Sequence, residues 1–275
     1  MRSFPFAAFA LLSLASPPPP AAAQEESQAN LVLTILGGTV TGHDLWAVAK
    51  QPLGVQDGSG RVDTLGLSRT INSGLVLGAA ATYFLSPHLG FHAELSYTAL
   101  PVDGQCVPVF INPDTANVTF QDLRRNEQVC GDISGQAATG GAITVFGGVT
   151  LRAASRGSVS PYVRGNLGVA VLSRSTIEMA GAYVVGSTIG VREVMTDRKP
   201  RAASVLVGAA AGFTAPLGTS YQFRFEVRDL IVSLDRAIGP ADGLGATPRA
   251  SRYYHNFALT LGLDVVLENK RGRRY

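Results

Sequence analysis

Charge and long apolar runs are both scarce in this chain of 275 residues. Only 16% of its residues are charged, whereas an ordinary soluble domain has about a quarter. Beyond the N-terminal segment no run of eighteen apolar residues occurs, which excludes helical membrane spans. Disorder is excluded too, because 46% of the residues are hydrophobic. The longest apolar stretch, Gly74 to Leu85, has the length of a strand that crosses a membrane.

Several chemical signatures are also missing. The sequence has no phosphate-cradling glycine loop, no cluster with metal-ligand spacing and no nucleic-acid motif, so we predict no cofactor, no metal and no nucleic-acid partner. The net charge of +3 is a weak signal, because Arg2 and four basic residues near the C-terminus account for more than all of it. We interpret residues 269–275 as a solvated basic tail.

Residues 1–23 have the features of a secretory signal peptide. Arg2 gives a positive start, residues 4–15 an apolar stretch, and residues 21–23 three alanines before a cleavage site. The mature chain is therefore expected to begin at Gln24 and to be exported.

Export gives a meaning to the only two cysteines. Cys106 and Cys130 lie 24 residues apart in one polar segment. In an oxidising compartment such a pair is most simply a disulfide, which would stabilise the fold by roughly 3 kcal/mol in the chain-entropy model.

Strict alternation is the main pattern in the chain. In residues 91–98 every odd position is apolar and every even position is polar, and residues 221–228 do the same. Residues 257–267 place six apolar residues against small or polar ones. Successive strand residues point to opposite faces, so each segment has one apolar face and one small or polar face.

Five less regular segments bring the number of predicted strands to eight: 31–43, 67–85, 139–153, 161–174 and 203–215. Tight turns follow the second, fourth and sixth strands, at 86–88, 154–160 and 216–218. Long polar excursions follow the others, at 44–66, 101–138, 175–202 and 234–252. An eight-stranded antiparallel meander with short turns at one end and long loops at the other is the architecture of small bacterial outer-membrane barrels.

Two features favour a membrane barrel over a soluble one. Aromatic residues gather near the short turns, as in a periplasmic aromatic girdle: Tyr83, Phe91, Tyr162, Phe213, Tyr221 and Phe223. The apolar face of the last strand is unbroken, and the outside of a barrel is its larger surface. We therefore expect apolar side chains to face lipid and polar ones to face the lumen.

The units GLVLGAAATYFLSPHLGFHAELSY, SVLVGAAAGFTAPLGTSYQFRFEV and NFALTLGLDVVL carry a resemblance to a known family. Residues 31–268 resemble the small eight-stranded outer-membrane β-barrels of the OmpA/OmpX type. The resemblance implies an all-β, up-and-down transmembrane barrel that forms a single domain over residues 24–275, with short periplasmic turns and long extracellular loops. It also implies a monomer among the lipid and lipopolysaccharide of a Gram-negative-type outer membrane.

Charged residues on the polar faces form the first candidate site. Six of them are expected inside the barrel: Glu94, Arg164, Arg224, Glu226, Arg228 and Asp264. An eight-stranded bore has room only for side chains, so facing charges should pair and close it. The alternative is a narrow channel for small solutes, with these residues setting its selectivity.

Histidines at the outer rim form the second candidate. His43 ends the first predicted strand and His255 opens the last, and these strands are neighbours in a closed barrel. They are either polar rim residues, or a metal site or acid–base pair of an outer-leaflet lipid-modifying enzyme. No Ser–His–acid arrangement accompanies them, so we predict a non-enzymatic protein with no catalytic residues. Its role is then structural, or it binds an extracellular ligand through residues 101–138 and 175–202.

Overall fold

The structure is a computed structural model that describes residues 31–55, 60–112, 125–153, 158–173, 178–196, 203–218, 220–233 and 253–267. The predicted signal peptide, its cleavage site and the basic tail lie outside these residues. Among the described helices, none is long and apolar enough to cross a membrane.

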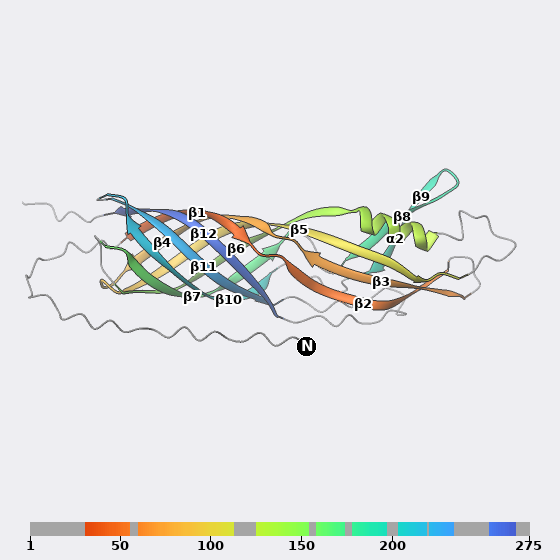
Figure 1. The fold of residues 1–275 in the computed structure, drawn as a ribbon, viewed down its shortest axis with the longest axis horizontal. Helices are drawn as coiled ribbons and strands as arrows, with labels where there is room; N and C mark the ends of the chain where they lie inside the picture. Colours follow the sequence, from red (N-terminus) through yellow and green to blue (C-terminus); the bar gives the residue numbers. More distant parts are fainter. Residues whose placement is uncertain are drawn as a thin grey trace, which may run out of the picture.

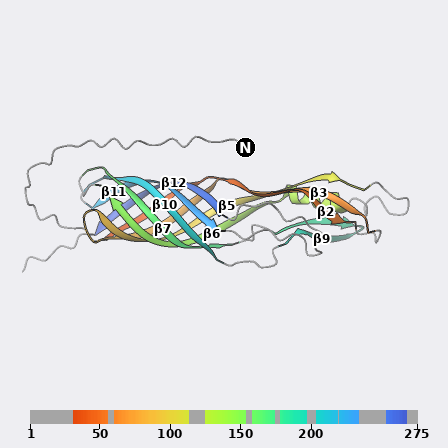
Figure 2. The same ribbon diagram turned by 90° about the horizontal axis from the view of Figure 1, so that it is seen from below.

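Eight antiparallel strands close into a barrel (Figures 1 and 2). In ring order they are β1 (Leu31–Val40), β4 (Gly74–Phe84), β5 (Leu89–Phe110), β6 (Ala137–Arg152), β7 (Ser160–Leu172), β10 (Ser204–Pro216), β11 (Tyr221–Ser233) and β12 (Tyr253–Leu267). The pairing of β1 with β12 closes the ring, and β5 pairs with β6. Apart from the closing pair β1 and β12, the barrel strands follow one another around the ring in the order in which they occur along the chain, so the predicted all-β, up-and-down barrel is confirmed.

The outer face of the barrel is apolar. On β12, Leu259, Leu261 and Leu263 are exposed, whereas Thr260 and Asp264, on the opposite face of the strand, are buried. Every barrel strand adds exposed apolar side chains, among them Leu33, Leu77, Leu95, Val145, Leu167, Val207, Val227 and Leu261. Burying a strand's polar face and exposing its apolar one reverses the usual arrangement in water, and it suits a barrel whose solvent is lipid.

The three short connections lie at one end of the barrel. Backbone hydrogen bonds close them: Leu85 N donates to Leu89 O over 2.9 Å, and Leu217 N donates to Tyr221 O over 3.0 Å. In the third connection Ala153 N donates to Pro161 O over 2.9 Å. The alternation of short and long connections read from the sequence is therefore present.

The structure divides one predicted strand. Residues 67–85 belong to two strands, β3 (Val62–Ile71) and β4, separated by Asn72 and Ser73. Opposite this break, Thr41 and Gly42 separate β1 from the next strand, and Gly42 N donates to Ser73 Oγ over 3.3 Å. The two breaks mark the level at which the chain leaves the closed ring.

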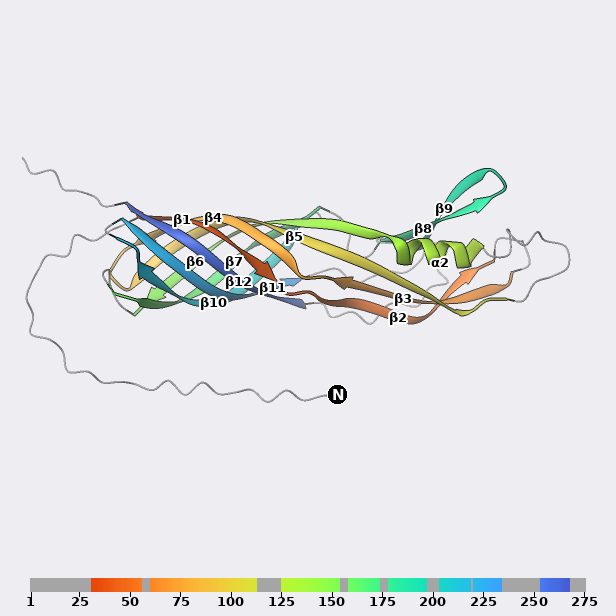
Figure 3. The same ribbon diagram turned by 45° about the horizontal axis from the view of Figure 1, so that its top comes forward.

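Beyond this level the long connections form a folded body. β2 (His43–Gly54), β3 and the distal half of β5 make a three-stranded sheet. β8 (Met179–Val185) and β9 (Thr188–Met195) make a separate hairpin, and α2 (Arg125–Gly135) packs between them. We call these elements the extension. It continues the barrel at the end away from the short turns (Figures 1 and 3).

The extension has a buried apolar core that is continuous with apolar side chains in the upper barrel lumen. Its members include Trp46, Leu53, Leu65, Leu67, Val129, Ile133, Met179, Val194 and Met195. The sequence predicted these connections as polar excursions and did not predict the strands and helix within them. β5 joins the two parts directly, because its 22 residues run through the barrel wall and into the extension.

Candidate functional site

The barrel lumen is crossed by a layer of buried ion pairs. Arg228 Nη1 donates to Glu94 Oε1 over 2.6 Å, and Arg164 Nη1 lies 3.4 Å from Glu94 Oε2. The second acid, Glu226, lies 3.1 Å from Arg164 Nη1 and 3.2 Å from Arg228 Nε. The side chains of all four residues are at most 2% exposed. Two arginines and two glutamates therefore share one connected network.

A second pair lies next to this network, toward the short turns. Arg224 forms a bidentate ion pair with Asp264, with Nε 3.0 Å from Oδ1 and Nη2 3.0 Å from Oδ2. Thr34 also donates to Asp264 Oδ1 over 2.7 Å. The six charged residues expected in the lumen are thus brought together as three arginines and three acids. Their formal charges cancel, which is the condition for keeping so many ionised groups buried.

Tyr162 was wrongly assigned to the outward aromatic girdle. It is 6% exposed and donates from its hydroxyl to Glu226 Oε2 over 2.8 Å. Tyr162 and Arg164 are two residues apart on β7 and therefore point to the same face. Because Arg164 faces the lumen, the alternation of strand residues places Tyr162 in the lumen as well.

The other five girdle residues face outward near the short turns. Tyr83, Phe91 and Tyr221 are about half exposed, and Phe213 is 36% exposed. Phe223 is partly exposed and lies beside Phe213, with ring centroids 6.5 Å apart. An aromatic belt at this level matches the headgroup region of a bilayer.

His92 lies in the lumen with a full set of partners that the sequence did not reveal. Its Nδ1 is 3.0 Å from Thr150 Oγ1, and its Nε2 is 2.8 Å from Asn166 Oδ1. A ring held on both nitrogens is fixed in place, so His92 acts as a structural polar contact between β5, β6 and β7.

Between the ion pairs and the extension, the lumen is lined by apolar side chains, which the sequence did not predict. A cavity of about 60 Å³ lies there, lined largely by aliphatic side chains: Val40, Ile71, Val76, Leu100, Ala142, Ala170, Leu172, Leu206, Leu230, Val232 and Ala258. Arg228 forms part of its lining. A dry cavity that admits benzene measures about 150 Å³. The present cavity is too small for a ligand of that size.

The two rim histidines face different environments. His43 lines the apolar cavity and stacks on Tyr254, with ring centroids 5.5 Å apart. His255 is more than half exposed, stacks on Phe257 and lies 2.8 Å from Asp229 Oδ2. Burial lowers the pKa of His43, the charge of Asp44 opposes this shift, and His255 adds to it. The histidines share no hydrogen bond among the described residues, and no group of three potential metal ligands occurs there.

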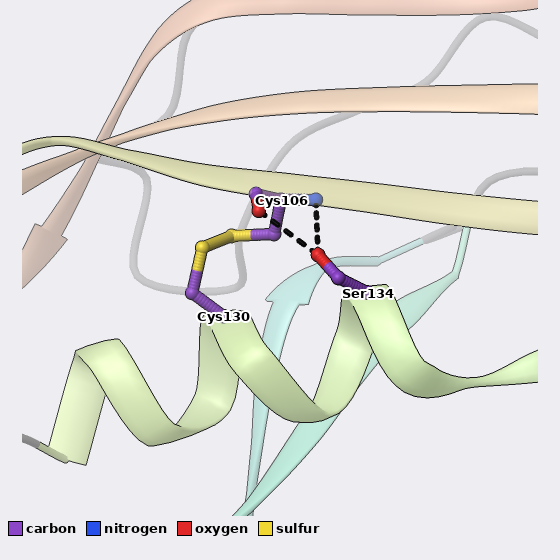
Figure 4. The surroundings of a disulfide bond; sticks show 3 residues. All are labelled: Cys106, Cys130 and Ser134. Atoms are coloured by element: carbon purple, nitrogen blue, oxygen red, sulfur yellow. Dashed lines mark hydrogen bonds between the residues drawn. A yellow bond between two sulfur atoms is a disulfide. The ribbon is translucent and has the colours of Figure 1, made fainter.

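The predicted disulfide is present in the extension (Figure 4). Cys106 on β5 is bonded to Cys130 on α2, with Cα atoms 5.0 Å apart. One helical turn further on, Ser134 accepts from Cys106 N over 3.0 Å and donates to Cys106 O over 2.9 Å. Covalent and polar contacts thus fix the helix to the strand that enters the barrel wall.

Asp63 ties four parts of the extension together. This buried carboxylate accepts from Asn112 N over 2.9 Å and from Asn126 Nδ2 over 2.8 Å. Arg192 Nη1 donates to Asn126 Oδ1 over 2.7 Å. β3, the segment just after β5, α2 and β9 therefore meet in one polar network, which holds the extension in a single arrangement.

Helix α2 also covers one edge of the β8–β9 hairpin. Gln128 Oε1 accepts from Val184 N over 2.8 Å, and Asp132 Oδ2 accepts from Ala182 N over 2.7 Å. Gln128 and Asp132 are four residues apart, so they lie on one face of the helix. Their oxygens take the place of a neighbouring strand along β8.

Comparison with known proteins assigns no family. No protein-family model and no curated protein matches the chain. Solved structures do resemble it. Neisserial surface protein A is 9% identical with a TM-score of 0.41, and the match covers 87% of this chain and 98% of that one. Outer membrane protein AlkL is 14% identical (TM-score 0.43; 94% and 99% covered), and OprG from Pseudomonas aeruginosa is 13% identical (0.42; 88% and 97%). Similarity this low assigns no activity, and the fold rests on the strand pairings.

Proposed function

We propose that this protein is a non-enzymatic outer-membrane barrel that anchors and presents a folded extracellular binding surface. The barrel supplies the membrane anchor, its lumen is closed by paired side chains, and the extension carries the binding role. The observation that carries the proposal is the extension itself, which has a buried core, a disulfide and a polar network centred on Asp63.

The closed lumen supports an anchor over a channel. Arg228 and Glu94 meet across the bore, and Arg164 and Glu226 fill the space beside them. Ions that pass through the lumen would have to break these buried pairs, and breaking a buried ion pair is costly. The two rim histidines do not form the acid–base pair considered from the sequence, because His43 lines the cavity and stacks on Tyr254 whereas His255 pairs with Asp229.

The rigidity of the extension supports binding over a purely structural role. A structural barrel needs only short loops, whereas here three long connections are folded against one another. A surface whose shape is fixed before binding loses less conformational entropy on contact. Continuity of β5 with the barrel wall holds that surface at a constant orientation to the membrane.

Two measurements test the proposal. In planar bilayers the purified protein should give no steady ion current, and a stable open conductance would favour the narrow channel. Cells that display the chain should adhere to protein-coated surfaces or to one another more than cells with an empty vector do. Equal adhesion by the two would contradict the binding role.

A further inference from the structure

Exposed strand edges in the extension are protected in two of three places. Edge strands attract other strands because their N–H and C=O groups lack partners, and proteins block them with bulges, prolines, charges or covering elements. β2 has two register shifts, and Lys50 and Pro52 lie on it. The free edge of β8 is covered by Gln128 and Asp132 of α2.

Among the described residues, the outer edge of β9 is open over residues 188–191, because its one register shift lies between Glu193 and Met195 and its charged residues, Arg192 and Glu193, follow this stretch. Ala182 and Val184 direct their N–H groups toward α2, so their cross-strand neighbours Val191 and Ile189 occupy sites without hydrogen bonds to β8. The N–H and C=O groups of Ile189 and Val191 therefore point away from the hairpin. No described backbone group bonds to them.

Apolar side chains accompany this open edge. Ile189 is 71% exposed and Val191 is 72% exposed, and both lie on the same face as the exposed Val184. These residues are far from the apolar outer face of the barrel. The hairpin projects from the extension with its tip away from the barrel (Figures 1 and 3). Gly186 begins that tip with a φ of 58°, which suits a tight two-residue turn.

We propose that β9 is a self-association strand that pairs, antiparallel, with β9 of a second copy of this chain. The proposal rests on the proposed surface-binding role of the extension and names its partner. Two hairpins would join edge to edge into one four-stranded sheet.

The sequence of β9 is self-complementary in one register. A two-fold axis at Gly190 places Ile189 opposite Val191 of the second copy, and Val191 opposite its Ile189. Each such pair exchanges two backbone hydrogen bonds through the groups that point away from β8. β-Branched cross-strand pairs are favourable. In this register Glu193 does not lie opposite Glu193 of the second copy, so like charges are not paired.

Chain direction then fixes where the second copy stands. β8 runs toward the hairpin tip, so β9 runs back toward the barrel. Two copies in one membrane would both direct β9 toward that membrane, and their edges could meet only in parallel. Antiparallel pairing requires copies that face each other from two membranes. The partner is therefore the same protein on an opposing cell, and many copies per cell make individually weak contacts additive.

The test uses two differently coloured cell populations that display the full chain. Wild-type cells should form mixed clusters. Ile189→Lys should reduce clustering about tenfold or more, because it places an ammonium group against Val191 in both symmetric pairs, and Val191→Glu should do the same. Mixing Ile189→Lys cells with Val191→Glu cells should restore mixed clusters, because Lys then faces Glu in one pair and Ile faces Val in the other.

Val184→Lys is the matched control. It adds the same charge on the same face of the hairpin, but Val184 lies on β8, beside Ile189, and does not face the second copy. This variant should cluster like wild type, and surface display of every variant is checked by antibody. Wild-type clustering by Ile189→Lys cells, or failure of the mixed variants to rescue, would overturn the proposal. Adhesion to protein-coated surfaces that survives Ile189→Lys would leave the binding role standing and remove only self-association.

Discussion

Arg228 on β11 and Glu94 on β5 form an ion pair of 2.6 Å between strands that stand opposite each other in the ring. Four steps separate β5 from β11 in either direction around the barrel. The contact therefore crosses the bore instead of linking neighbours within the wall. Arg164 on β7 reaches the same carboxylate from between them. This relationship makes the lumen a packed interior.

Glu94→Gln should destabilise the barrel strongly. It leaves the buried Arg228 and Arg164 with one shared anion, and breaking a buried pair costs about 3–5 kcal/mol. Denaturant unfolding followed by circular dichroism measures the loss. Adding Arg228→Gln to Glu94→Gln should recover part of it, because the formal charges balance again. Glu193→Gln, at an exposed position of the extension, should change the unfolding free energy by less than about 0.5 kcal/mol.

Tyr162→Phe should lower barrel stability by about 1.5–3 kcal/mol. The substitution keeps the ring but removes a buried hydroxyl that donates to the charged Glu226. Tyr221→Phe is the control, because Tyr221 is exposed at the girdle and its loss of a hydroxyl should be nearly neutral. Equal unfolding midpoints for the two variants would contradict the placement of Tyr162 in the lumen.

Removing the disulfide should loosen the extension and leave the barrel intact. Trp46 is the only tryptophan and is buried in the extension core, so its fluorescence reports that part alone. Cys106→Ser combined with Cys130→Ser should move the fluorescence transition to lower denaturant concentration. The unfolding free energy that this transition reports should fall by about 3 kcal/mol. The circular dichroism transition of the strands should stay in place. A joint shift of both signals would show that the two parts unfold together.

The extension end should lose stability in mild acid because of His43. Burial lowers the pKa of this ring in the folded state, while the unfolded chain has the ordinary value of about 6.5. The unfolded state then binds more protons, so His43 supports the fold above pH 6.5 and this support is lost as the pH falls below it. His43→Gln should flatten the pH dependence of the Trp46 transition between pH 7 and about 5. An unchanged slope would assign the effect to other groups.

Alternation was enough to predict the barrel because lipid and lumen impose opposite polarities on successive residues. Residues 257–267 keep an apolar residue at every outward position, and β12 includes all of them. The lumen charges followed from the same parity. Tyr162 was misplaced because its aromatic character was weighed above the direction of Arg164, and the parity rule already contained the correct answer.

The strands and the helix of the extension were not predicted, because their sequences show the periodic patterns of strands and helices only weakly. β2 changes register twice, which breaks the period of two exactly where the strand should show it. Helix α2 is mostly polar, and it is held by Cys130, Asp132 and Gln128 through contacts with strands far away in sequence. The apolar upper lumen was also missed, since Val76 and Ala258 look like minor exceptions until opposite walls are brought together. Long-range packing, absent from any local window, decides these regions.

The proposed binding role requires a barrel that spans the outer membrane with the extension outside the cell. Single cysteines at Thr188, in the extension hairpin, and at Leu217, in a short turn, test this with a membrane-impermeant maleimide on intact cells. Both positions are exposed, so accessibility to the reagent depends on the side of the membrane. We expect labelling of Thr188→Cys on intact cells and of Leu217→Cys only after the outer membrane is opened. Labelling of Leu217→Cys on intact cells without labelling of Thr188→Cys would contradict it.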